Sequence, residues 1–184
     1  MPLPSHKVTI CGIPELSQHC SVGVSHVLSI IDTHEPRPPA LDDYFEIEHE
    51  LIRFDDVVAE YPGFEACTPA HIETVLAFGE RVHARNGSHV LVHCHAGVSR
   101  STAAAAILMC QHAPGHEEEA FLKLLGLRKH GWPNTRMVEF ADTLLGRDGA
   151  LLRGLIAYRR ALLLEKPHLS EIIRNIGRGH ELPD

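Results

Sequence analysis

The chain has 184 residues, of which 44% are hydrophobic, enough for one compact domain and too many for a disordered chain. Its formal net charge of −7 disfavours a broad nucleic-acid surface, because binding phosphate backbones requires clustered cations. No run of about 18 apolar residues is present, and the first seven residues lack the apolar stretch of a secretion signal. The sequence therefore predicts a cytoplasmic protein that contacts neither nucleic acid nor membrane.

The cysteines and histidines show no pattern of a disulfide framework or a metal site. Five cysteines are scattered without a Cys-x-x-Cys pair, which is typical of free thiols in a reducing compartment. The 15 histidines follow no recognised ligand spacing. We therefore expect no cofactor and no bound metal.

In the first half of the chain, apolar runs of β type alternate with turns. Four runs are predicted to be strands: residues 8–13, 26–31, 51–54 and 89–93. Prolines between His34 and Asp43 predict a loop, and Pro62-Gly63 marks a turn. A helix is expected to begin at Thr68-Pro69, where threonine suits the cap and proline the first helical position, and to end at Asn86-Gly87.

After Arg100 the pattern is helical, and four helices are predicted at residues 101–113, 117–129, 137–145 and 151–163. The first is apolar on all sides, which predicts a buried helix. The tail from Pro167 contains glycines and a proline and is expected to be partly loose. We therefore predict one compact domain over residues 1–165 and a C-terminal extension over residues 166–184.

Strands with crossover helices, followed by helices, indicate an α/β fold. The prediction is a central, mostly parallel sheet of about four to five strands with helices on both faces.

One segment carries the main functional signal: His93-Cys94-His95-Ala96-Gly97-Val98-Ser99-Arg100-Ser101, between the fourth strand and a helix. Ligands gather at the carboxyl ends of strands in α/β sheets, and the backbone N–H groups of a short loop that opens a helix bind anions. Gly97 allows the backbone conformation that such a loop needs. The predicted substrate-binding residues are His95, Ala96, Gly97, Val98, Ser99 and Arg100.

Within this loop, Cys94 is the candidate nucleophile, because a helix N-terminus and nearby cations favour the thiolate form of a cysteine. Five residues separate Cys94 from Arg100, so the loop can curl and bring a guanidinium fork over the same phosphoryl oxygens. Ser101 is expected to donate a hydrogen bond to the sulfur, to cap the helix, or both. His93 either orients the cysteine or is an ordinary core histidine.

A cysteine that displaces an alkoxide or phenoxide needs an acid to protonate the leaving oxygen. Asp55 and Asp56 follow the third strand and precede a turn-rich loop, from which an acid can move over a bound substrate. The same carboxylate, once ionised, would activate the hydrolytic water. The alternative for both aspartates is a turn or helix cap.

The string Val92 to Ser101 resembles the protein tyrosine phosphatase superfamily, whose signature is Cys-x5-Arg-Ser/Thr. It is most similar to dual-specificity phosphatases, which often carry Val-His-Cys-x-Ala-Gly-x-Ser-Arg-Ser. Phe54-Asp55-Asp56 resembles the general-acid loop of smaller members, in which the second acid serves; this favours Asp56 while leaving Asp55 open. Pro133-Asn134 resembles a Pro-Asn pair whose asparagine supports the phosphate loop; the alternative for Asn134 is a helix cap. The resemblance spans about residues 8–146 and implies the α/β fold of that family.

The resemblance implies a cysteine-dependent protein phosphatase that hydrolyses phosphotyrosine through a phosphocysteine intermediate, with phosphoserine and phosphothreonine as further candidate substrates. Its expected partner is a phosphorylated protein or peptide. Positions 95–99 hold no lysine, which argues against polyphosphate substrates. The alternatives are a phosphatase for a non-protein phosphate ester and a module that binds phosphoproteins without turnover. The element that deepens the pocket of tyrosine-specific members is not recognisable, so we expect a shallower pocket with Tyr44 or Phe45 on one wall.

Overall fold

The computed structural model describes residue 3 and residues 6–183, so the outermost ends of the predicted domain and extension, residues 1–2, 4–5 and 184, lie outside the described residues. One parallel sheet, in the order β1-β4-β2-β3, is formed by β1 (Lys7–Gly12), β2 (His26–Ile31), β3 (Glu48–Arg53) and β4 (His89–Cys94). The predicted α/β class is confirmed, and the sheet, expected to be mostly parallel with about four to five strands, has four strands that all pair in parallel.

The position of β4 in the middle of the sheet explains its continuous apolar sequence. Strands β1 and β2 flank it on both sides, and all six of its residues are buried. Side chains alternate between the faces, so Val90 and Val92 join the larger core and Leu91 joins a smaller one. The register pairs Gly12 with Cys94, which brings the carboxyl ends of β1 and β4 side by side.

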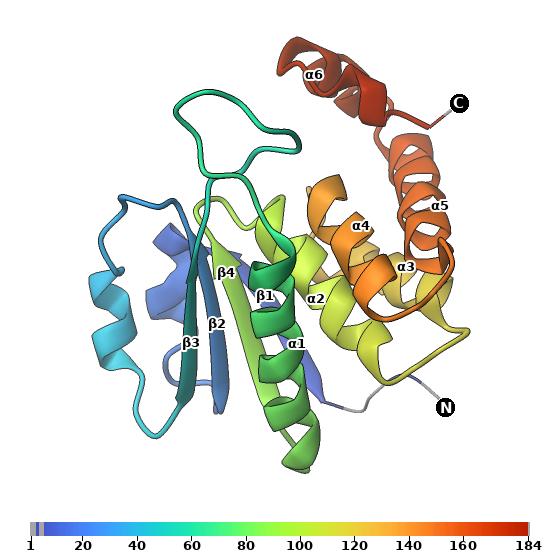
Figure 1. Cartoon of the computed structure of the whole chain (residues 1–184). Helices are drawn as coiled ribbons and strands as arrows, with labels where there is room; N and C mark the ends of the chain where they lie inside the picture. The colour runs from blue at the N-terminus through green and yellow to red at the C-terminus, as the bar shows by residue number, and fades with distance from the viewer. Residues whose placement is uncertain (1–2, 4–5, 184) are drawn as a thin grey trace.

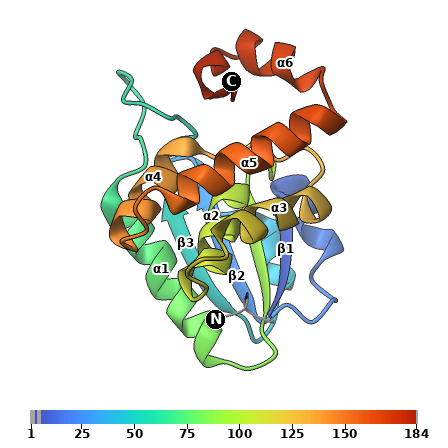
Figure 2. The ribbon, with the colours of Figure 1, turned by 90° about the vertical axis from the view of Figure 1, so that its right-hand side faces the viewer.

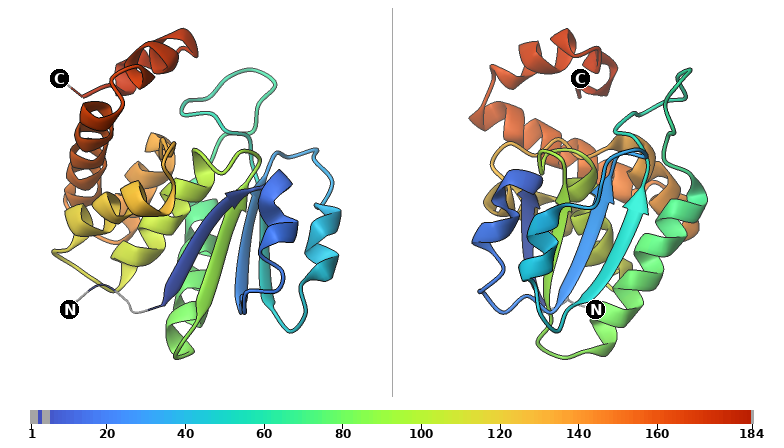
Figure 3. Two further views of the ribbon diagram at one scale, coloured as in Figure 1. Left: turned by 180° about the vertical axis from the view of Figure 1, so that it is seen from behind. Right: turned by 90° about the vertical axis from the view of Figure 1, so that its left-hand side faces the viewer.

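Helices cover both faces of the sheet (Figures 1 and 3). The α-helices α1 (Pro69–Ala84), α2 (Arg100–Gln111), α3 (Glu117–Leu127), α4 (Thr135–Leu144) and α5 (Ala150–Glu165) pack with the larger core. The opposite face carries two 3-10 helices, η1 (Ile13–Gln18) and η2 (Pro39–Asp43). Leu16 and Leu41 from these two helices fill the smaller core. Helix α5 contacts α3 and α4 and forms an outer layer (Figure 2).

Two elements differ from the sequence-based expectation. The segment between His34 and Asp43 contains η2 where only a loop was expected, because Pro39 fits the first position of a helical turn. Strand β3 begins at Glu48 rather than Leu51 and ends before Phe54. Its first residues are polar because β3 lies at the edge of the sheet, where charged side chains are common.

The expectation of a partly loose tail is wrong for the residues that follow α5. They form α6 (Leu169–Asn175) and the 3-10 helix η3 (Gly179–Glu181), with Ile173 and Glu181 buried. In Figures 1 and 2 this segment lies at the same end of the molecule as the loops that leave β3 and β4. Over the described residues, none of the helices is both long and apolar enough to cross a membrane.

Candidate active site

The loop between β4 and α2 is held in shape by donors that lie outside it. The backbone N–H of Ile13 donates to the His95 carbonyl over 2.9 Å. The Arg128 guanidinium donates to the carbonyls of Ala96 and Gly97, with distances of 2.9 and 3.0 Å. These three carbonyl groups therefore point away from the centre of the loop.

The next two carbonyl groups are held in the same way by the start of α2. The Thr102 hydroxyl donates to the carbonyl oxygens of Val98 and Ser99 over 2.6 and 2.9 Å. In a planar trans peptide the N–H points opposite to the C=O, so the N–H groups that follow these carbonyls face the inside of the loop. A concave row of N–H groups at a helix N-terminus is suited to a phosphate or another oxyanion.

Two glycines let this loop lie directly against the end of β1. Gly97 has φ of +69°, and a Cβ there would lie 2.5 Å from the backbone carbon of Cys11. A Cβ on Gly12 would lie 2.8 Å from the carbonyl oxygen of His95. Gly97 is thus needed for both its backbone angle and its close approach to β1.

Cys94 stands at the first position of the loop, at the end of β4. Its Sγ lies 3.2 Å from the Ser101 hydroxyl, the pair that the sequence predicted. Burial raises the pKa of the other buried thiols, Cys11, Cys67 and Cys110, to about 12, so they stay protonated at neutral pH. Of the four buried cysteines, Cys94 is the one that opens the loop just described.

Arg100, the first residue of α2, is 2% exposed and reaches across the ends of two further strands. Its Nη1 donates to the Phe54 carbonyl over 2.6 Å and lies 2.6 Å from a carboxylate oxygen of Asp32. Its Nε has no hydrogen-bond partner within the described part of the chain. A buried guanidinium with an unused donor suits an incoming anion.

A cavity of about 350 Å³ connects these groups to the loop that follows β3. Its walls are formed by Asp32, Asp55, Asp56, Val57, Phe64, His95 and Arg100. Cys94, at 2% exposure, is covered at the end of β4.

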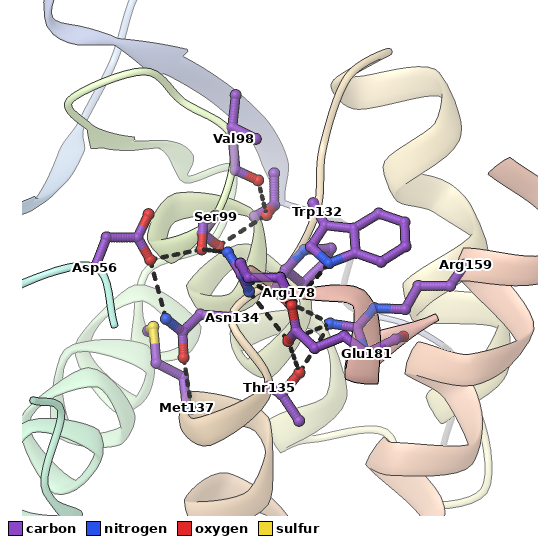
Figure 4. Close-up of polar contacts among 12 residues, drawn as sticks. Asp56, Val98, Ser99, Trp132, Asn134, Thr135, Met137, Arg159, Arg178 and Glu181 are labelled. Atoms are coloured by element: carbon purple, nitrogen blue, oxygen red, sulfur yellow. Dashed lines mark hydrogen bonds and ion pairs between the residues drawn. The ribbon is translucent and has the colours of Figure 1, made fainter. Parts of the chain in front are cut away.

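The two candidate acids have different partners. The carboxylate of Asp55 accepts backbone hydrogen bonds on both oxygens, from Thr33 over 3.4 Å and from Glu65 over 2.7 Å. Asp56 accepts on Oδ1 alone, from the Ser99 hydroxyl over 2.7 Å and the Asn134 amide over 3.0 Å (Figure 4). Asp55 therefore holds the loop that follows β3 in place, whereas Asp56 is tied to Ser99 in the loop between β4 and α2.

The segment that contains this loop is similar in sequence to a known protein family. Residues 59–130, which contain the whole Cys94 loop, match the sequence model of the family described as protein-tyrosine phosphatase. The resemblance to the protein tyrosine phosphatase superfamily is confirmed. No curated protein sequence matches the chain.

Solved phosphatase structures share the fold. Human DUSP28 superposes with a TM-score of 0.57 at 20% identity, over 76% of this chain and 94% of its own. A mouse putative dual specificity phosphatase complexed with zinc tungstate gives 0.52 at 22% identity, over 75% and 80%. PTPMT1 in complex with PI(5)P gives 0.53 at 17% identity, over 80% and 94%. The chain therefore has a dual-specificity phosphatase-like fold.

Two residues predicted to support the loop of this phosphatase fold have well-defined partners. His93 Nε2 lies 2.6 Å from the Ser29 hydroxyl on β2, and burial lowers the pKa of His93 to about 4, so the ring is neutral at physiological pH. Asn134 caps α4 by accepting from the Met137 N–H over 3.2 Å and also donates to Asp56. The side chain of Asn134 thus caps α4 and binds the segment after β3, where it also donates to the Val57 carbonyl over 3.2 Å. Its backbone N–H donates to the Ser99 carbonyl over 3.3 Å. Support of the loop by the Asn134 side chain stays a prediction.

The prediction for the wall of the pocket is wrong. Neither Tyr44 nor Phe45 lines the cavity: the Tyr44 hydroxyl donates to the Leu16 carbonyl in the smaller core, and Phe45 is 80% exposed. Phe64, 57% exposed on the loop between β3 and α1, takes that place.

Three polar residues at this site were not predicted. Asp32 pairs with Arg100, Arg128 holds the loop carbonyls, and Arg178 donates to the Ser99 hydroxyl over 3.2 Å. Asp32 had a sequence signal, since it is an acid directly after a predicted strand. The two arginines lie far along the chain and had none.

Proposed function

We propose that the chain is a cysteine-dependent protein phosphatase that hydrolyses phosphotyrosine through a phosphocysteine intermediate. One observation carries the proposal: Cys94 opens a loop in which the carbonyl groups of residues 95–99 are held outward, with Arg100 buried at its far end. This arrangement supplies a nucleophile, a row of N–H donors and a guanidinium around one position. Phosphoryl transfer needs this combination of positioning and charge stabilisation.

In the first step, the Cys94 thiolate attacks phosphorus and a sulfur–phosphorus bond forms as the bond to the leaving oxygen breaks. The loop N–H groups and Arg100 bind the three non-bridging oxygens. Asp56 in its protonated form gives its proton to the leaving oxygen, so tyrosine departs as the neutral phenol.

In the second step, the ionised Asp56 takes a proton from a water molecule, whose oxygen attacks phosphorus. The sulfur–phosphorus bond breaks, and inorganic phosphate and the Cys94 thiolate are released. Ser101, 3.2 Å from the sulfur, donates a hydrogen bond to the departing thiolate. The enzyme returns to its starting state with no change in oxidation level.

The hydrogen bonds around the two aspartates support Asp56 as the acid. Both oxygens of Asp55 are occupied by backbone N–H groups, which fix its place in the turn. Oδ2 of Asp56 accepts no hydrogen bond from the described residues and belongs to a side chain that lines the cavity. It is therefore the more available of the two carboxylates.

The charges around the cavity support a phosphoamino acid rather than a polyphosphate ester. Three carboxylates, Asp32, Asp55 and Asp56, line it together with a single arginine. A second phosphate beside the first would meet these carboxylates and be repelled. The exposed ring of Phe64 offers an apolar contact to a phenyl ring, which favours phosphotyrosine. All five cysteines are free, which supports the reducing cytoplasm as its location.

The decisive test of the reaction is hydrolysis of an aryl phosphate without added metal by the wild type and by Cys94→Ser. We expect turnover to fall below detection in Cys94→Ser. Cys20→Ser, which changes a cysteine away from the loop, is the matched control and should keep wild-type activity. Full turnover in Cys94→Ser would overturn the proposal.

A substrate panel then tests the substrate class. Phosphotyrosine peptides are expected to be hydrolysed faster than matched phosphoserine and phosphothreonine peptides, and faster than PI(5)P in mixed micelles. Faster hydrolysis of PI(5)P would move the assignment to a non-protein ester. Tight phosphopeptide binding without release of phosphate would instead indicate a binding module.

A further inference from the structure

The C-terminal arm, residues 169–182 with α6 and η3, contacts the catalytic loop directly. Arg178 Nη1 donates to the Ser99 hydroxyl over 3.2 Å, and the same hydroxyl donates to Asp56 over 2.7 Å. Figure 4 shows Arg178, Ser99 and Asp56 in one continuous row. The arm lies outside residues 59–130, the segment that matches the phosphatase family.

A buried carboxylate fixes the arm in this position. The Glu181 side chain is 1% exposed and accepts from Trp132 Nε1 over 3.0 Å, from Arg159 Nη2 over 2.9 Å and from the Thr135 hydroxyl. It also accepts from Arg178, through Nε and, over 3.1 Å, through Nη2. Loss of Glu181 would leave the buried guanidinium of Arg159 without its carboxylate, which is strongly unfavourable.

The ionisation of Glu181 is secured by its arginine partners. Burial alone raises its pKa, but the hydrogen bond from Arg178 and the charges of Arg159 and Arg178 outweigh burial and lower the pKa to about 2. The carboxylate therefore stays charged at physiological pH and orients the Arg178 guanidinium. The remaining donor of Arg178, Nη1, points to Ser99.

The direction of the hydrogen bonds follows from the groups involved. A guanidinium donates only, so the Ser99 oxygen must accept from Arg178. The single hydroxyl proton of Ser99 is then free to point to Asp56 Oδ1, which carries none when ionised. Arg178 thus fixes the rotation of the Ser99 hydroxyl, and Ser99 fixes the carboxylate of Asp56.

We propose that Arg178 is a positioning residue for the general acid, so that the C-terminal arm is a working part of the active site. The inference rests on the proposed function, since it assigns Arg178 a role through Asp56. Without Arg178, the Ser99 hydroxyl can rotate away and Asp56 loses one of the two side-chain donors that hold its Oδ1. Protonation of the leaving oxygen then becomes less efficient, while binding of the phosphoryl group is unaffected.

The test is the dependence of kcat on the leaving group in Arg178→Met. Phenyl phosphate, a poor leaving group that needs the acid, is expected to lose about tenfold in kcat, against less than about twofold for p-nitrophenyl phosphate. The inhibition constant for vanadate should stay within about twofold of the wild type, because the loop and Arg100 are unchanged. Arg174→Met, an exposed arginine on the same arm, is the matched control and should change neither quantity.

A double variant separates positioning from a general loss of structure. If Arg178 acts through Asp56, then adding Arg178→Met to Asp56→Asn should cause no further loss. An equal loss for both leaving groups, or an additive loss in the double variant, overturns the inference. Neither result affects the proposed function, which Cys94→Ser and the substrate panel test separately.

Arg178→Lys serves if Arg178→Met does not fold. Lysine keeps the charge opposite Glu181 but cannot donate to Glu181 and Ser99 as a fork. We expect an intermediate leaving-group dependence at an unchanged melting temperature. If kcat of Arg178→Lys depends on the leaving group as in the wild type, the inference is overturned.

Discussion

The carboxylate of Asp32 lies 2.6 Å from Nη1 of Arg100, so the guanidinium proposed to hold the phosphoryl group is paired with an acid. Asp32 is about two-fifths exposed and follows β2 directly, whereas Arg100 is buried. The same carboxylate lies 3.2 Å from the ring of His95 in the loop. A bound phosphate would share Arg100 with this negative charge.

Asp32→Asn is therefore expected to tighten the binding of oxyanions. Removing a partly exposed like charge near the site should lower the inhibition constant for vanadate roughly fivefold, the equivalent of about 1 kcal/mol. The measurement is competitive inhibition of aryl phosphate hydrolysis. Asp42→Asn, which removes an exposed acid that pairs with Arg37 away from the cavity, should leave the constant unchanged. Weaker vanadate binding in Asp32→Asn would mean that Asp32 holds Arg100 in place for the substrate.

Gly97→Ala tests the contact between the loop and β1. The substitution adds a Cβ 2.5 Å from the backbone of Cys11 at φ of +69°. Gly87→Ala is a close control, because Gly87 has φ of +71° with open space around it. We expect Gly87→Ala to lower the free energy of unfolding by about 1 kcal/mol with little effect on kcat/KM. Gly97→Ala should cost more stability and most of the activity. Equal effects of both variants in urea unfolding would show that the close approach is unimportant.

Arg128→Lys tests whether outward-held carbonyls shape the catalytic loop. Arg128 binds the Ala96 and Gly97 carbonyls and both carboxylate oxygens of Glu15, four contacts that an ammonium group cannot reproduce. We expect kcat/KM to fall about tenfold or more and stability by about 1 kcal/mol. Arg136→Lys changes an equally buried arginine that binds the Cys67 carbonyl and Glu60 and lies over the Phe140 ring, and it should leave kcat/KM unaltered. Unchanged kinetics in Arg128→Lys would contradict this role.

The buried His93 ring predicts a specific loss of stability in acid. Its pKa is about 4 in the folded chain against an ordinary value of 6.5. Between these values the unfolded chain binds the proton and the folded chain does not, so the free energy of unfolding is highest above pH 6.5 and falls towards pH 4. The full effect is on the order of 3 kcal/mol. Between pH 7 and pH 4, the free energy of unfolding of His93→Gln should fall by less than that of the wild type, and the difference between the two falls should equal this effect. Urea unfolding measures both. Equal losses in both proteins would show that His93 is not the responsible group.

The fold and the centre of the site could be predicted because their signals are local in sequence. Strand β4, the loop from Cys94 to Arg100 and the buried helix α2 are consecutive, and their order alone places a sulfur at a helix N-terminus. The position of β4 between β1 and β2 also explains why its sequence is apolar throughout.

The surroundings of the loop could not be predicted, because they depend on contacts between distant residues. Arg128 and Glu15 are 113 positions apart, and Arg178 and Ser99 are 79 apart. Nothing in the sequence of the tail indicates that the Glu181 carboxylate accepts hydrogen bonds from α4, from α5 and from the loop that precedes α4. Phe64 was missed for the same reason, since only the folded loop brings it to the cavity.

The most direct test of the account is the capture of the covalent intermediate. Wild-type enzyme and Asp56→Asn are mixed with an aryl phosphate, quenched in acid within milliseconds to seconds, digested and analysed by mass spectrometry. We predict one phosphoryl group on the peptide that contains Cys94, more abundant in Asp56→Asn because hydrolysis of the intermediate is slowed. A phosphoryl group on any other residue, or turnover with no phosphorylated peptide in either protein, would contradict the account.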